Sequence, residues 1–73
     1  MALHESTFEY LKPTDEQIKT MAILREASAN YAKVIDGLLP DGADKTFILR
    51  NVRQNAMWIN VAVTREADGT PRP

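Results

Sequence analysis

The stretch KTFILRNVRQNAMWINVAVTRE, residues 45–66, decides the fold because it carries two apolar faces where an ordinary surface helix carries one. At about 100° per residue, one helical stripe has heptad-like spacing and suits a single neighbouring helix. Its members are Leu49, Val52, Ala56, Ile59 and Val63. A nearly opposite face carries Phe47, Trp58, Val61 and Ala62, beside Asn51, Gln54 and Arg65. One hairpin partner cannot cover both faces, so the second face needs another chain or a ligand.

A capping box precedes this stretch and marks the start of a first helix. Gln17 lies three residues after Thr14. In this pattern the side chain of each residue accepts a hydrogen bond from the backbone N–H of the other residue. We expect the first helix to span residues 14–39 and the second to span residues 44–66, with Asp41 or Asp44 as its starting acid. Residues 40–43 between them form so short a connection that the two helices are expected to pack as an antiparallel hairpin.

The first helix also has two apolar stripes. One consists of Leu24, Ala27, Tyr31, Val34 and Leu38, and the other consists of Ile18, Ala22, Ala29 and Ala32. Arg25 projects into the second stripe, where small residues let another backbone or a ligand come close. In one interpretation the methylene groups of Arg25 lie along apolar surface and its charge stays in water. In the other, its guanidinium lies at the edge of a pocket, where it can donate two parallel hydrogen bonds to a phosphate.

Length, charge and composition limit the function classes. A chain of seventy-three residues buries so little of its own surface that its folded state is only marginally stable. It has no cysteine to form disulfides, so oligomerisation is the remaining means of stabilisation. The formal charge of −1 makes long nucleic acid an improbable partner. The sequence has no apolar run of membrane length and no signal peptide, so we expect a cytoplasmic protein that does not associate with membranes.

No catalytic or cofactor motif is present in the sequence. The only histidine, His4, falls in a start of residues 1–7 that we expect to be flexible and solvent-exposed, and it has no partner at metal-ligand spacing. Residues 67–73 are expected to be a flexible tail. We therefore expect no enzyme, no metal and no cofactor.

Residues 8–13 form an extended arm, because Lys12 precedes Pro13 and is pushed away from helical geometry. Phe8 and Tyr10 lie on one side of this arm. One interpretation is that both rings cap the end of a helical bundle. The other is that Tyr10 stacks on a base of a nucleotide ligand while Lys12 lies near its phosphate. The second helix has a third stripe with two possible interpretations. It is either a solvent-exposed face or a row of hydrogen-bond donors for a ligand. That stripe consists of Arg50, Arg53, Met57, Asn60 and Thr64.

Four segments in this order resemble a known family of small helical-hairpin proteins. They are FEYLKPTDEQ (8–17), MAILR (21–25), LLPDGADKT (38–46) and AMWINVAVTR (56–65). The family is that of the phage anti-CBASS and anti-Thoeris proteins, which act as sponges for cyclic nucleotide signals.

The resemblance implies a non-enzymatic homo-oligomer, typically a hexamer, that sequesters cyclic dinucleotides such as 3′,3′-cyclic GMP-AMP, and in some members cyclic trinucleotides. It implies that Tyr10 stacks on a base, that Arg25 lies near the phosphates, and that Asn60 and Thr64 line a second pocket. The chain lacks the extra strands of longer anti-Thoeris members, which makes isomers of cyclic ADP-ribose less expected. The alternative from another class is a structural or inhibitory oligomer that binds a host protein through the Phe47, Trp58 and Val61 face.

Overall fold

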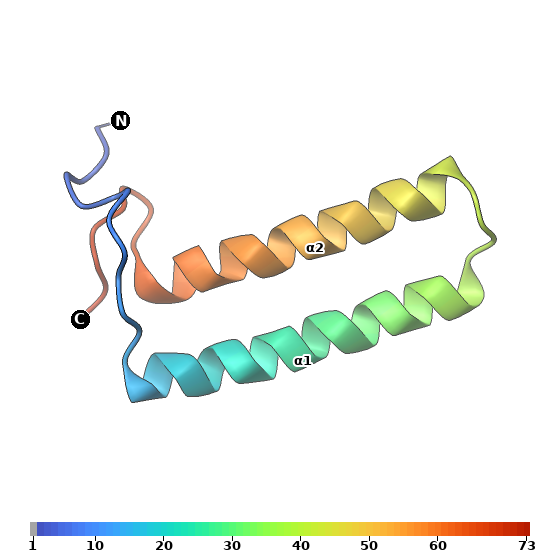
Figure 1. Cartoon of the computed structure of the whole chain (residues 1–73), viewed down its shortest axis with the longest axis horizontal. Helices are drawn as coiled ribbons and strands as arrows, with labels where there is room; N and C mark the ends of the chain where they lie inside the picture. The colour runs from blue at the N-terminus through green and yellow to red at the C-terminus, as the bar shows by residue number, and fades with distance from the viewer. Residues whose placement is uncertain (1) are drawn as a thin grey trace.

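The computed structural model describes residues 2–73 and consists of two antiparallel helices joined by a short loop (Figure 1). Helix α1 spans Asp15–Leu38 and helix α2 spans Ala43–Thr64. The two chain ends lie together at the end of the hairpin opposite the loop (Figure 1). The all-α hairpin is confirmed. Met1, part of the start that we expected to be flexible, lies outside the described residues.

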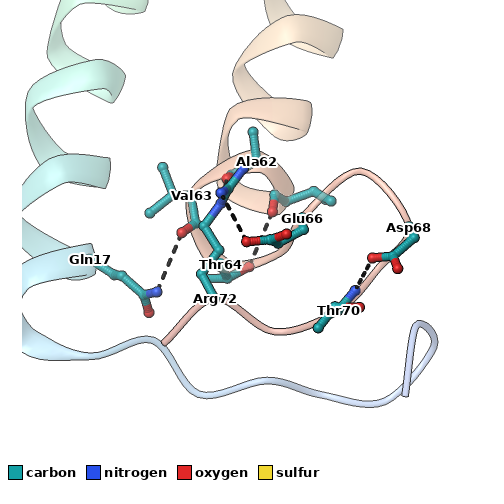
Figure 2. A network of polar contacts seen from close by, with 9 residues as sticks. Gln17, Ala62, Val63, Thr64, Glu66, Asp68, Thr70 and Arg72 are labelled. Carbon is teal, nitrogen blue, oxygen red and sulfur yellow. Dashed lines mark hydrogen bonds and ion pairs between the residues drawn. The ribbon is translucent and has the colours of Figure 1, made fainter. Parts of the chain in front are cut away.

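The capping box at the start of α1 is present. The Gln17 N–H donates to Oγ1 of Thr14, and the Thr14 N–H donates to Oε1 of Gln17. Thr14 and Leu39 are the two caps of α1, so the helix lies one residue inside each end of the expected range. Gln17 also donates from Nε2 to the backbone oxygen of Val63, which ties the first turn of α1 to the last turn of α2 (Figure 2).

The start of α2 differs from the expectation that Asp41 or Asp44 caps it. Gly42 is the N-cap and no side chain caps the helix. The Asp41 carboxylate is instead paired with Lys45, whose Nζ lies 3.0 Å from Oδ1 of Asp41 and 3.0 Å from Oδ1 of Asp36. These two hydrogen bonds raise the pKa of Lys45 above its ordinary value. The lysine therefore ties the end of α1 to the loop and the start of α2.

The stripe of α2 that we expected to face one neighbouring helix does face α1. All five of its members are partly buried: Leu49, Val52, Ala56, Ile59 and Val63. In α1, Tyr31 and Val34 of the first apolar stripe are 60% and 55% exposed, so most of that stripe does not face α2. The face of α1 against α2 lies between its two apolar stripes, and its buried or partly buried members are Met21, Leu24, Ser28, Ala32 and Ile35. Apart from Leu24 and Ala32, the members of both apolar stripes flank the interface between the helices and are exposed.

The hairpin is one helical layer thick. Its extents are 44 × 28 × 16 Å. It exposes 5976 Å², whereas a compact monomer of 8.2 kDa exposes about 4,500 Å². The exposed large apolar side chains include Phe47, Trp58 and Val61 of the second face of α2, which are 68%, 61% and 43% exposed. This face is thus uncovered in the single chain.

Neither described helix combines the length and the apolar character that crossing a bilayer requires.

Replacing the most buried apolar side chain tests this packing. Ile35 is 8% exposed and is the only apolar residue classed as buried among those described, so Ile35→Ala should lower the free energy of unfolding by about 2 kcal/mol or more. Urea unfolding followed by circular dichroism measures the change. Glu26→Ala, an exposed site on the same helix, is the control and should stay within about 0.5 kcal/mol of the parent protein. Equal stability of the two variants would contradict the interface described above.

Candidate functional site

Arg65 organises the end of the hairpin where the two chain termini meet. It is the C-cap of α2 and is only 7% exposed. Its Nη2 donates to the backbone oxygen of Glu9 at 2.8 Å, and its Nη1 donates to the backbone oxygen of Gly69 at 2.8 Å and to Oγ of Ser6 at 3.1 Å. Arg65 is extended rather than helical, so α2 ends at Thr64 instead of at the expected Glu66. One side chain therefore joins the N-terminal segment, α2 and the C-terminal segment.

The N-terminal segment forms turns rather than a free start. The N–H of His4 donates to the backbone oxygen of Asp68 at 2.7 Å, and the N–H of Thr7 donates back to the oxygen of His4. His4 is partly buried, which corrects the expectation that it is solvent-exposed, because its Nδ1 lies 2.8 Å from Oγ of Ser6. Gly69 packs closely against this segment, because a Cβ there would clash with Oγ1 of Thr7.

The C-terminal segment, expected to be a flexible tail, folds back along the end of α2 (Figure 2). The N–H of Glu66 donates to the oxygen of Thr70, and the N–H of Arg72 donates to the oxygen of Thr64. The Arg72 side chain adds a 2.8 Å bond from Nε to the backbone oxygen of Ala62. Composition alone suggested flexibility because these bonds are made mostly by backbone groups, which every residue carries.

Within this segment the Asp68 carboxylate closes a turn with Thr70. The N–H of Thr70 donates to Oδ1 of Asp68 at 2.9 Å (Figure 2). Hydrogen bonds from Thr70, first from its hydroxyl and then from its N–H, hold the pKa of Asp68 below its ordinary value. The ionised carboxylate is thus the form that the folded chain prefers.

The arm presents its aromatic rings to solvent. Phe8 and Tyr10 are 92% and 85% exposed, so in the single chain they do not cap the helical pair. Leu11 and Pro13 are the partly buried residues of the arm. Glu9, held by Arg65, directly precedes Tyr10, which fixes the backbone from which the tyrosine ring projects.

Tyr10 lines a hollow of about 460 Å³ between the arm and the end of α2. The side chains that complete it include Met21 of α1 and Asn60, Thr64 and Arg65 of α2. Thr64 is 7% exposed, and its hydroxyl donates to the backbone oxygen of Asn60 at 3.0 Å. The hydroxyl oxygen of Thr64 keeps acceptor capacity toward the hollow.

A second hollow, of about 200 Å³, adjoins the first because both are lined by Met21 and Asn60. Arg25 and Arg53 reach it from opposite helices. The same two arginines also line a third hollow of about 320 Å³, whose other members are mostly small or apolar: Ser28, Ala29, Ala32, Leu49, Val52 and Ala56. The three hollows form one trough, with Tyr10 at one end, two guanidinium groups in the middle and alanines at the far end.

The trough contains four of the six predicted site residues. Tyr10, Asn60 and Thr64 line its first hollow, and Arg25 lines the second and third. Phe8 and Lys12 line none of the three, and Tyr10 and Arg25 do not share a hollow within one chain.

Arg65 was missed as a site residue because helical periodicity placed it on the second apolar face of α2. Its position after the last helical turn gave no usable signal, because its guanidinium donates to Ser6, Glu9 and Gly69 of the two terminal segments rather than to the last carbonyls of α2.

The lining of the trough combines an aromatic residue, polar groups and two arginines. The second and third hollows have two guanidinium groups and no acidic side chain in their linings. Across residues 2–73, no group of three or more histidine, cysteine or acidic side chains is placed to hold a metal ion. Aromatic rings stack on bases and guanidinium groups bind phosphate, so a lining of this composition has the chemistry to contact a nucleotide.

In a comparison with protein families, residues 2–64 match the model described as "Acb2/Tad1, hairpin domain". No curated protein and no solved structure matches the chain. The matched segment covers both helices and the arm, and it ends just before Arg65.

Removing the Arg65 side-chain bonds tests its role as the tie between the termini. In Arg65→Met, the amide hydrogens of Thr7 and Glu9 should exchange with solvent at least about tenfold faster, because the turns that protect them lose their anchor. Hydrogen exchange followed by NMR measures this, and the amides in the middle of α1 serve as internal reference. Arg72→Met is the matched control, since the Arg72 side chain bonds to Ala62 and Glu66 and to no residue of the N-terminal segment. Unchanged exchange in Arg65→Met would show that the arm is held by other contacts.

The lowered pKa of Asp68 predicts a pH dependence. The folded chain holds this proton less tightly than the unfolded chain does, so the carboxylate stabilises the fold above the ordinary value of 3.8, and the contribution disappears as the pH falls through the folded-state pKa. Asp68→Asn keeps an acceptor without the charge. Its melting temperature should lie below that of the parent protein near about pH 7, and the gap should close as the pH drops below about 4. A gap that is constant over this range would rule out the carboxylate charge as its cause.

Proposed function

Because the chain belongs to the Acb2/Tad1 hairpin-domain family, whose members sequester cyclic nucleotide signals and are binding proteins rather than enzymes, we propose that it is a phage counter-defence protein that binds cyclic oligonucleotides without degrading them. The proposed ligands are cyclic dinucleotides such as 3′,3′-cyclic GMP-AMP, with cyclic trinucleotides as a second class. The proposed place of action is the host cytoplasm, where such messengers would be made.

The trough is the observation that carries this proposal. Tyr10 offers an exposed ring on which a base can stack, and its backbone is already held in place through Glu9 and Arg65. Arg25 offers a planar fork that can donate two parallel bonds to a phosphodiester. Asn60 and Thr64 supply polar groups between these two ends, near the position of a ribose or base edge.

We further propose that the functional unit is a homo-oligomer larger than a dimer, with a hexamer as the expected form. The surface in excess of a compact monomer, about 1,400 Å², exceeds the roughly 800 Å² that a chain contributes to a standard interface. This excess supports contacts with more than one neighbour if each interface is of standard size. A neighbour that laid its arm on the alanine end of the trough would bring its Tyr10 to the Arg25 of the first chain.

Phe8 and Lys12 enter the proposal through the same assembly. They lie on the arm beside Tyr10, and both are exposed. In a single chain they line none of the hollows of the trough, so any contact with ligand has to be made across a boundary between protomers. There Lys12 would approach a phosphate, and Phe8 would cover a base or the neighbouring helix.

A second candidate function is the binding of a host protein through the outer face of α2. A separate hollow of about 380 Å³ lies on this face and is lined by Gln54, Met57, Trp58 and Val61. If the oligomer left this face open, Trp58 would keep a red-shifted fluorescence in the assembled protein, and activity would survive the loss of Tyr10 and Arg25.

Substitution of Tyr10 tests the proposed ligand site. Tyr10→Ala should weaken the binding of 3′,3′-cyclic GMP-AMP by about 1–3 kcal/mol, or roughly 5- to 150-fold, because a stacked base loses its aromatic partner. Tyr10→Phe keeps the ring and should bind nearly as well as the parent protein. Isothermal titration calorimetry with this dinucleotide and with cyclic tri-adenylate measures both. Failure of the parent protein to bind any member of a panel of cyclic nucleotides would reject the proposed function.

A further inference from the structure

Arg53 stands opposite Arg25 across the middle of the trough. Arg25 comes from α1 and Arg53 from α2, and both line the second and third hollows. The floor between them includes Ser28 and Ala56, whose short side chains leave room for a ligand atom. An anion seated there would lie between cations from both helices.

These two arginines are also left without partners. Within residues 2–73, Lys19, Lys45 and Arg72 each have a carboxylate partner, and Arg65 donates to backbone oxygens and to a serine. Neither Arg25 nor Arg53 donates a side-chain hydrogen bond or makes an ion pair in that part of the chain. Two like charges that line the same hollows repel weakly in water, and an anion bound between them would add two attractions that outweigh this repulsion.

We propose that Arg53 is a ligand-binding residue that holds a phosphodiester of the cyclic nucleotide jointly with Arg25, so that the phosphate is clamped between α1 and α2. This inference rests on the proposed function and deepens it. It assigns the centre of the trough to a phosphate and leaves the Tyr10 end to a base. Selectivity for a ring with phosphodiesters then comes from two forks on a rigid pair of helices rather than from one exposed arginine.

The chain offers a matched control in Arg50. It lies on α2 one turn from Arg53, is exposed and has no described partner, but it lines none of the three hollows of the trough. Loss of Arg50 changes the net charge by the same amount and at nearly the same place. A difference between the Arg50 and Arg53 variants therefore reports direct contact rather than the general field of the protein.

The experiment titrates 3′,3′-cyclic GMP-AMP into the parent protein, Arg53→Gln, Arg50→Gln and Arg25→Gln by calorimetry. Arg53→Gln should weaken binding by at least about tenfold, as Arg25→Gln should, whereas Arg50→Gln should change it by less than about threefold. Equal, small effects of Arg53→Gln and Arg50→Gln with a binding-competent parent would overturn the role of Arg53 and leave the proposed function intact. Absence of binding by the parent protein would overturn the proposed function itself.

A second measurement on the unmodified protein covers the case in which Arg53→Gln fails to fold or assemble. The side-chain Nε–H signals of Arg53 and Arg50 are followed by NMR during titration with 3′,3′-cyclic GMP-AMP. The Arg53 signal should shift and become protected from exchange, while the Arg50 signal should stay where it is. An Arg53 signal that does not respond to saturating ligand would overturn the inference.

Discussion

Two helices packed side by side can bury only one stripe each, and this limit governs the rest of the molecule. The partly buried stripe of α2 is used against α1, and after that pairing the hairpin is 16 Å thick with both broad faces open. Disulfides and thiolate metal sites, which stabilise many small domains, are unavailable to a chain without cysteine. What remains is local reinforcement at the two ends of the hairpin and, in our proposal, contacts between copies.

The two ends are reinforced differently, and the difference bears on function. At the loop, Lys45 joins the end of α1 to the start of α2 through Asp36 and Asp41. At the other end, the guanidinium of Arg65 donates hydrogen bonds to backbone oxygens of the N-terminal and C-terminal segments. The first arrangement closes a turn, whereas the second fixes the arm that carries Tyr10. A stacking residue whose backbone is ordered before the ligand arrives loses less entropy on binding.

The sequence pattern of each helix predicted the features that depend on that helix alone. The Thr14 capping box, the hairpin and the stripe of α2 from Leu49 to Val63 all followed from spacing and cap chemistry. The side of α1 that faces α2 was not predicted, because it includes Ser28 and lies between two apolar rows of similar strength. Tertiary geometry had to choose between them. The folded termini were missed for a related reason: backbone bonds between segments about sixty residues apart leave no local signature.

The central claim is that copies of this hairpin assemble and that their assembly retains an intact cyclic nucleotide. Native mass spectrometry of the protein recovered from cells with an active cyclase tests it most directly, since one spectrum reports both subunit number and ligand mass. The account predicts an oligomer larger than a dimer, a hexamer in the expected form, that carries the mass of an unhydrolysed cyclic oligonucleotide. A well-folded monomer without bound nucleotide would contradict it.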